Sequence, residues 1–391
     1  MNKFFYLFLL LVPYYATAQE LKGKVIDEKT NQPLEMVSVF VNTTTIGTVT
    51  NAKGEFSLSI KPGRYELIVS IVGYEPIVYA LEAPFSAPLL FKLRSKTYAL
   101  KTVSVKAKRD ASWYDNLQVF KENFLGRSEV ARKCVLLNPD NLVIVFHPHT
   151  GLLEVSSEEP LEIENPELGY KIHYTLVEFK YFMKEGYVTF LGYQNYEPMK
   201  AGKSRQRKWD KNRQKAYRGS TMHFVRALRA EKLEQEGFNL RRLLRIPNPN
   251  RPTEAEFEAL RARLRTRGTI TSPNDPDQVM LSKASLPKII EKLDTTRVPY
   301  TDYLIHSGED MLMRFKGYFQ VVYTGEKEEP AYVHFTSGSR PRQPSFQTSV
   351  FYLRADQVIL EKNGSITPPL DIMFEGYWGW EKLGDMLPLD Y

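Results

Sequence analysis

Residues 20–107 consist of short stretches in which hydrophobic and polar residues alternate. Residues 36–42 place their valines on one face, and such stretches recur about every 8 to 12 residues, which predicts half-buried strands of a sandwich or small barrel. Residues 54–60 and 64–73 show the same period of two on either side of Pro62–Gly63. We therefore expect these two strands to pair as a hairpin.

The hydrophobic period changes after residue 108. Large apolar residues recur every three to four positions between Trp113 and Phe124, which predicts an amphipathic helix. Residues 141–157 and 168–196 alternate again and are rich in tyrosine. Each of these two stretches predicts a pair of strands around a short turn, in an antiparallel sheet with one solvated face.

A helical insertion is predicted at residues 204–267, where the alternation stops. It contains two successive basic helices and a third after a proline-rich link, where Thr253 and Glu256 have the spacing of a capping box. β structure is expected to resume at residues 278–283 and to continue to the C-terminus, including residues 330–335. The predicted fold class is mainly β with a helical insertion, and its C-terminal part is an antiparallel β-rich α+β region.

Residues 1–18 have the pattern of an export signal. Lys3 supplies a positive charge, residues 4–12 are apolar, and residues 16–18 are the small residues of a cleavage site, so the mature chain is expected to begin at Gln19. No later apolar stretch approaches the about 20 residues of a membrane-spanning helix. The expected location is the periplasm or the outer-membrane surface, or outside the cell, with no transmembrane segment in the mature chain.

Cys134 is the single cysteine of the 391 residues. Its distance from the cleavage site excludes lipoprotein anchoring, and one cysteine forms no intramolecular disulfide. With 42% hydrophobic and 13% aromatic residues, the chain has enough apolar surface to build its core without one.

Positive charge is concentrated between Lys200 and Arg245. This segment contains 15 basic and 4 acidic residues. Its excess of 11 positive charges exceeds the whole-chain net charge of +7, which leaves −4 for the remaining residues. A patch of one sign attracts phosphates or acidic surfaces.

The N-terminal part resembles the carboxypeptidase regulatory-like domain. The resemblance is carried by GKVID, PLEMVSV, TNAKGEF and PGRYELIVSIVGY, which follow one another between residues 23 and 74. It implies a seven-stranded, immunoglobulin-like sandwich of the transthyretin type over residues 20–107. The same module begins many TonB-dependent outer-membrane receptors and other exported proteins of Bacteroidota, and residues 100–109 resemble the way it ends there. The resemblance implies a docking or spacer role without hydrolysis, and the module contains no His or Cys.

Residues 108–391 resemble the C-terminal region of an uncharacterised group of exported Bacteroidota proteins that carry the same N-terminal module. The similarity lies in residues 123–139, 163–179, 216–238 and 376–391. It supports architecture and location, and it implies no activity.

His306 and Glu309 form a His-x-x-Glu pair of the kind that begins the zinc site of metallocarboxypeptidases. Zinc needs a third protein ligand and an open position for water. The only later histidine is His334, which follows too closely for that family. These residues are therefore weak metal candidates, and no cofactor is predicted.

His147 and His149 are a second weak metal candidate. On a strand, the two side chains would project from the same face and share a metal ion. Pro148 and the adjacent turn favour a surface hairpin tip instead, and the sequence offers no nearby carboxylate or cysteine to complete a site.

The basic helix is the preferred binding surface. Its cations surround two aromatic residues, a combination that contacts phosphates and stacks on bases. In an exported protein the expected partners are lipid headgroups, lipopolysaccharide or acidic polysaccharide rather than nucleic acid. The candidate residues are Arg205, Arg207, Lys208, Trp209, Lys211, Arg213, Lys215, Tyr217 and Arg218. In the competing interpretation, these cations pair with the glutamates of neighbouring helices, Glu231, Glu234, Glu236, Glu254, Glu256 and Glu258.

Two functions therefore remain open. The preferred one is a non-enzymatic envelope protein whose sandwich docks or spaces a C-terminal region that binds another envelope protein or an anionic surface component. The alternative is an exported hydrolase, metallocarboxypeptidase-like or other, with its site in the C-terminal region near His306 and Glu309 or near Asp371 and Glu375. No complete catalytic motif supports the alternative, because a G-x-S-x-G elbow and nucleotide-binding loops are both missing from the sequence.

Overall fold

A computed structural model describes most of the chain in two compact units. The described residues are 19–61, 63–83, 85, 87–96, 109–267, 275–338 and 340–391. The expected export signal, and most of the segment 100–109 that resembles the end of the module, lie outside them. The first unit is Met1–Lys215 with Lys382–Tyr391, and the second is Ala216–Glu381. Within the described residues, no helix has the length and apolarity that crossing a membrane requires.

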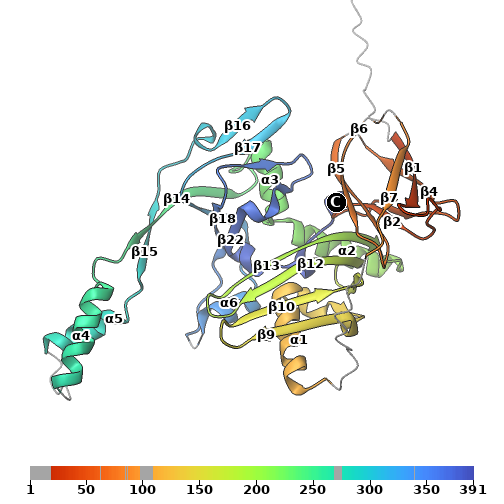
Figure 1. Cartoon of the computed structure of the whole chain (residues 1–391). Coiled ribbons are helices and arrows are strands. Elements are labelled where there is room, and N and C mark those ends of the chain that lie inside the picture. The colour runs from red at the N-terminus through yellow and green to blue at the C-terminus, as the bar shows by residue number, and fades with distance from the viewer. Residues whose placement is uncertain are drawn as a thin grey trace, which may run out of the picture. The chain divides into compact units, whose positions relative to one another are not determined.

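The N-terminal strands form the predicted seven-stranded sandwich (Figure 1). They are β1 Gln19–Asp27, β2 Ser38–Val41, β3 Gly47–Val49, β4 Glu55–Ile60, β5 Gly63–Ser70, β6 Ile77–Ala83 and β7 Leu89–Leu93. Their order is β4-β1-β7 in one sheet and β3-β2-β5-β6 in the other. Alternate residues such as Val25, Leu58 and Val69 are buried and form one core, as the period of two predicts.

The predicted β4–β5 hairpin is wrong. β4 pairs with β1, with Leu58 opposite Leu21, whereas β5 pairs with β2 and β6. The two strands belong to different sheets, and their apolar faces contribute to the same core. A short link between two alternating strands suits an in-plane hairpin as well as a crossing between sheets, so the pattern by itself does not select the partner.

The rest of the first unit is a six-stranded antiparallel sheet with two helices. The strands are β8 Val135–Leu136, β9 Leu142–His147, β10 Leu152–Ser157, β11 Leu161–Asn165, β12 Tyr170–Phe182 and β13 Tyr187–Pro198; the helices are α1 Ala111–Phe124 and α2 Lys203–Tyr217, whose end lies past the unit boundary. The strand pairs β9–β10 and β12–β13 confirm the two predicted hairpins. Phe120 and Phe124 of α1 pack edge-on against Phe179 of β12, so the predicted helix covers the sheet with its apolar side.

Backbone hydrogen bonds join the sandwich to this sheet. The Thr43 amide donates to the Gln194 carbonyl at 2.7 Å, and the Tyr196 amide donates to the Thr44 carbonyl at 2.9 Å. The Leu389 amide of the C-terminal tail donates to the Thr43 carbonyl at 2.7 Å. The loop after β2 is thus held by β13 on one side and by the chain terminus on the other.

The second unit contains two antiparallel sheets and several helices. One sheet has the order β15-β14-β18-β19-β22 and the other β16-β17-β20-β21. The strands are β14 Phe238–Pro247, β15 Ile289–Asp294, β16 Leu304–Ser307, β17 Asp310–Met313, β18 Tyr318–Lys327, β19 Phe346–Leu353, β20 Val358–Leu360, β21 Ile366–Thr367 and β22 Ile372–Gly376. The helices are α3 Thr221–Arg229, α4 Glu254–Arg267, α5 Pro276–Ala284, α6 Pro330–Ser337 and α7 Tyr377–Trp380.

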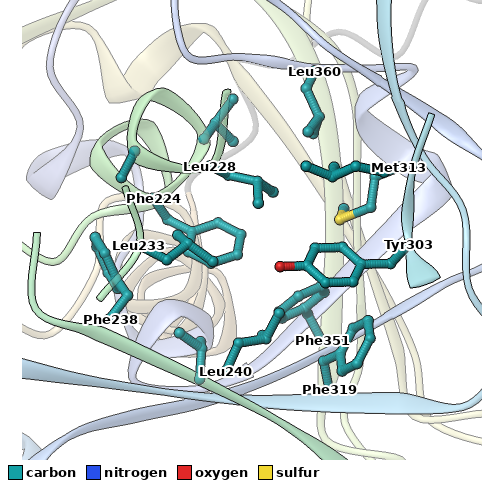
Figure 2. Close-up of a cluster of buried hydrophobic side chains, with 14 of the residues drawn as sticks. Phe224, Leu228, Leu233, Phe238, Leu240, Tyr303, Met313, Phe319, Phe351 and Leu360 are labelled. Atoms are coloured by element: carbon teal, nitrogen blue, oxygen red, sulfur yellow. The ribbon is translucent and has the colours of Figure 1, made fainter. Parts of the chain in front are cut away.

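A buried cluster from α3 and both sheets forms the core of this unit (Figure 2). Phe224 of α3 packs edge-on against Phe238 of β14 and Phe351 of β19. Met313 and Leu360 add the second sheet to the same cluster. Away from this core, the β14–β15 ribbon continues to the α4–α5 pair at its far end (Figure 1).

Three secondary-structure predictions in this unit need correction. The segment predicted as a helical insertion contains β14, which lies between β15 and β18 in the sheet. Phe238, Leu240 and Leu243 are buried, but the run of arginine and leucine after Leu240 hides the alternation. Residues 278–283 belong to helix α5, and residues 330–335 belong to helix α6. Both helices have a proline in their first turn, a position that favours helix initiation.

The third predicted helix begins as expected. The Thr253 hydroxyl accepts from the Glu256 amide at 3.3 Å, and the Glu256 carboxylate accepts from the Thr253 amide at 2.7 Å. This reciprocal pair confirms the capping box at the start of α4.

His223 makes the stability of the second unit sensitive to pH. Its ring is buried beside Phe238 and Tyr323, and Nδ1 accepts from the Gly219 amide at 3.2 Å. The ring proton therefore lies on Nε2, 3.2 Å from Glu236. Burial lowers the pKa of His223 below 6.5 despite the nearby carboxylate.

We expect the free energy of unfolding to fall as the pH drops below about 6.5, because the unfolded chain then binds a proton that the buried ring resists. Urea unfolding of wild type and His223→Asn between pH 8 and pH 5 measures this dependence. The variant is expected to lose part of the pH slope, whereas His306→Asn, at an exposed histidine, should keep it. Equal slopes in wild type and His223→Asn would contradict the assignment.

Candidate functional site

Helix α2 carries a high density of positive charge. Its 15 residues, KSRQRKWDKNRQKAY, include seven basic residues and one acidic residue, Asp210. The first turn contains no acidic residue to offset the helix dipole. Like charges four residues apart destabilise a helix by about 0.2–0.5 kcal/mol per pair. Contacts outside the helix must therefore hold α2 in place.

One face of α2 donates hydrogen bonds to successive backbone carbonyls between β11 and β12. Trp209 Nε1 donates to the Pro166 carbonyl at 2.8 Å, and Asn212 Nδ2 donates to the Glu167 carbonyl at 2.8 Å. Arg213 Nε donates to the Leu168 carbonyl at 2.7 Å, and its Nη2 donates to the Gly169 carbonyl at 3.2 Å. We call residues 166–169 the carbonyl turn. Side chains three and four positions apart share a helix face. One face of α2 therefore hydrogen-bonds to all four carbonyls of the turn.

Gly169 allows Trp209 to approach the turn. Its φ is +70°, and a Cβ at this position would lie 2.2 Å from the Trp209 ring. Asn165 is fully buried, accepts from the Leu168 amide at 3.0 Å and donates to the Gly384 carbonyl at 2.8 Å. The carbonyl turn is thus fixed before α2 contacts it, and Trp209 is only 1% exposed.

Glu167 adds an ionic contact between α2 and the carbonyl turn. Its carboxylate lies 2.9 Å from Lys208 Nζ and 3.1 Å from Lys133 Nζ, and its side chain is 13% exposed. The hydrogen bond from Lys208 lowers the pKa of Glu167. Lys208 therefore forms an ion pair with Glu167 of the same chain.

The opposite face of α2 presents four exposed cations. Lys203, Arg207, Lys211 and Lys215 are four residues apart and lie on the side away from Trp209. No residue that the structure describes forms an ion pair or hydrogen bond with any of these four side chains. We call them the outward row. Lys203 lies outside the helix that the sequence predicts, which begins at residue 204, although the four-residue spacing of the cations extends to it.

The remaining candidates have different environments. Arg205 and Arg218 are exposed. Trp209 is a core residue, and Arg213 is 11% exposed with its guanidinium 4.1 Å from the Tyr170 ring. Tyr217 is half-buried with its ring 4.9 Å from that of His223. The expectation that Trp209 is available to stack on a ligand is therefore wrong.

The glutamates expected to neutralise the basic helix contact other residues of the second unit. These contacts are Glu231 with His306, Glu234 with Arg297, Glu236 with His223, Glu254 with Lys288, Glu256 with Thr253 and Glu258 with Arg261. Apart from Glu256, whose capping contact with Thr253 the sequence predicts, these carboxylates have partners that the sequence does not predict.

The residues proposed for a hydrolase contact other side chains. His306 Nε2 lies 3.4 Å from Glu231, and Glu309 lies 2.9 Å from Lys362. His334 is exposed on α6. Among the residues described, no group of three or more His, Cys, Asp or Glu side chains is placed to hold a metal ion.

The carboxylates near the C-terminus also differ from a catalytic pair. Glu375 accepts two hydrogen bonds from Arg245, at 3.0 and 2.6 Å. Arg245 also contacts Glu291 at 2.9 Å and lies over the Tyr318 ring. Its hydrogen bond with Glu375 raises the pKa of Arg245. Glu375 is thus held in an ion-pair network, while Asp371 is half-buried and its carbonyl accepts from the Arg354 amide.

The two neighbouring histidines do not share a strand face. His147 ends β9, and His149 lies in the following turn. His147 Nε2 is 2.9 Å from Glu154 on β10. The β9–β10 hairpin brings Glu154 close to His147, a contact that the sequence spacing alone does not predict.

Part of the chain is similar in sequence to a known receptor. In Bacteroides thetaiotaomicron, the TonB-dependent receptor SusC is 35% identical over 91 residues, which cover 23% of this chain and 9% of the receptor. The chain thus spans less than a tenth of that relative.

Similarity to solved structures is weak. A chain of a type II cohesin–X-dockerin complex from Acetivibrio cellulolyticus has 16% identity and a TM-score of 0.18, with 29% of this chain and 79% of that chain covered. A putative membrane-associated protein of unknown function from Bacteroides fragilis has 10% identity and a TM-score of 0.16, with 91% and 92% covered. The family assignment comes from sequence instead: residues 21–105 match the model of the CarboxypepD_reg-like domain, which confirms the resemblance of the N-terminal module.

Proposed function

We propose that this chain is a non-enzymatic exported cell-envelope protein that uses the outward row of α2 to bind phosphate groups of anionic lipid or lipopolysaccharide. The CarboxypepD_reg-like domain and the similarity to a TonB-dependent receptor point to an envelope-associated protein. The observation that carries the binding proposal is the outward row, because four exposed cations without described partners lie on one rigid face.

The geometry of the row suits a charged surface rather than a single small anion. Residues four apart on a helix are separated by about 6 Å along its axis, so the row extends for about 18 Å. A basic residue near an anionic membrane contributes about 1 kcal/mol. Four such residues together give binding that is strong at low salt and weak at high salt.

The sandwich has a supporting role in this proposal. Its residues Thr43 and Thr44 bond to β13, the strand that precedes α2. The module is therefore attached through backbone contacts to the same sheet that supplies the carbonyl turn. We propose that the sandwich docks or spaces this sheet within the envelope.

Charge reversal tests the outward row. Vesicles of phosphatidylglycerol and phosphatidylcholine are sedimented at low salt with wild type and with the variant Lys203→Glu, Arg207→Glu, Lys211→Glu, Lys215→Glu. We expect affinity to fall by about a thousandfold, which corresponds to about 4 kcal/mol. A control reverses four exposed sandwich lysines, Lys24, Lys53, Lys61 and Lys92. Undiminished binding of the row variant, or an equal loss in the control, would remove the proposal.

A charge-matched pair separates the two faces of α2. Arg207→Gln removes an exposed cation and should weaken vesicle binding about fivefold, because about 1 kcal/mol is lost, with little change in stability. Arg213→Gln removes a cation that holds the carbonyl turn. It should lower the free energy of unfolding by about 1–3 kcal/mol. Urea unfolding and vesicle sedimentation of both variants check the contrast, and identical profiles would contradict it.

Metal content tests the non-enzymatic part of the proposal. Elemental analysis of the mature chain, purified without chelators, is expected to find zinc far below one ion per chain. If one tightly bound zinc were present per chain and absent from His306→Ala, the hydrolase alternative would replace this proposal.

A further inference from the structure

A cleft of about 300 Å³ opens in the second unit beside the core cluster. Its buried part is lined by Leu233, Leu240 and Tyr303, and its rim carries the exposed residues Glu234 and Arg297 and the half-buried Arg241. A cavity of about 150 Å³ holds one benzene molecule. The cleft therefore has room for a ligand of about twelve non-hydrogen atoms.

Tyr303 contributes a polar group to the apolar end of this cleft. Its side chain is 2% exposed, and Figure 2 shows its hydroxyl pointing into the surrounding apolar side chains. No described residue hydrogen-bonds to the Tyr303 hydroxyl. Burial raises the pKa of Tyr303, so the group is a neutral phenol that both donates and accepts. Because Tyr303 lines the cleft and its hydroxyl has no described partner, a ligand with a matching group would form a hydrogen bond with it.

The rim of the cleft has an excess of positive charge. Arg297 Nε lies 2.9 Å from Glu234, so these two charges offset each other. Arg241 Nη1 donates to the Leu240 carbonyl at 2.8 Å. No carboxylate among the described residues pairs with Arg241, and the other donors of its guanidinium remain available for a planar anion.

We propose that this cleft binds a small organic carboxylate with an apolar, aromatic body and a hydroxyl group at the opposite end. The carboxylate pairs with Arg241 at the rim, the body packs between Leu233 and Leu240, and the hydroxyl bonds with the Tyr303 hydroxyl. This site lies in the second unit and is separate from the outward row, which belongs to the first. Its ligand binding is therefore an addition to the proposed surface binding and can fail without affecting it.

Two probes that differ in one hydroxyl test the site. Titration calorimetry on the mature chain compares 3-(4-hydroxyphenyl)propionate with 3-phenylpropionate. Wild type is expected to bind the hydroxylated probe about three- to tenfold more tightly, the value of one neutral hydrogen bond. Tyr303→Phe should remove this preference and leave the affinity for 3-phenylpropionate unchanged.

Variants at the rim test the charge assignment. Arg241→Gln should weaken both probes about tenfold or more, because a hydrogen bond to a charged group is lost. Glu234→Gln releases Arg297 and should tighten both. Arg354→Gln, an exposed cation outside the cleft, should change neither affinity.

Three results would overturn the proposal. The first is no saturable binding of either probe at about 1 mM. The second is equal affinity of wild type for the two probes. The third is binding that Arg241→Gln leaves unchanged, which would place the probes elsewhere. The last two comparisons need no Tyr303 variant. They therefore test the proposed site even if Tyr303→Phe fails to fold.

Discussion

The candidate surface depends on the hydrogen bonds that α2 donates to the carbonyl turn. A helix with seven cations and one carboxylate gains little from its own electrostatics, and its indole, amide and guanidinium donors are satisfied by four consecutive carbonyls instead. Buried Asn165 and Gly169 shape the turn that presents those carbonyls. Because the inward face is fixed in this way, the opposite face, the outward row, is fixed as well.

Cations that are paired within the protein differ from cations that can bind an external anion. Arg213, Lys208 and Arg245 are cations in the sequence, but each is engaged with a carbonyl or carboxylate. Lys203 and Arg207 belong to the outward row, where no described residue offers a partner. A segment's net charge therefore overstates its binding surface, because cations that hydrogen-bond to the protein's own carbonyls or carboxylates are less available to an external anion.

Agreement between sequence and structure follows the range of the interactions involved. Local patterns were predicted well: α1, the β9–β10 and β12–β13 hairpins and the capping box at Thr253 all form. The wrong predictions concern segments whose structure depends on strands far away in the sequence. β4 and β5 alternate as expected but pair with other strands, and the strand character of β14 depends on its position between β15 and β18.

The sequence by itself determined the β-rich class and the basic character of α2, because these follow from composition and short-range periodicity. Its resemblance to a known family identified the sandwich module. Only the tertiary structure decided which cations face solvent, that Trp209 is buried, and that the unpaired Tyr303 hydroxyl lies at a cleft with Arg241 at its rim. These features arise from contacts between segments far apart in the chain, and a single sequence carries no direct record of such contacts.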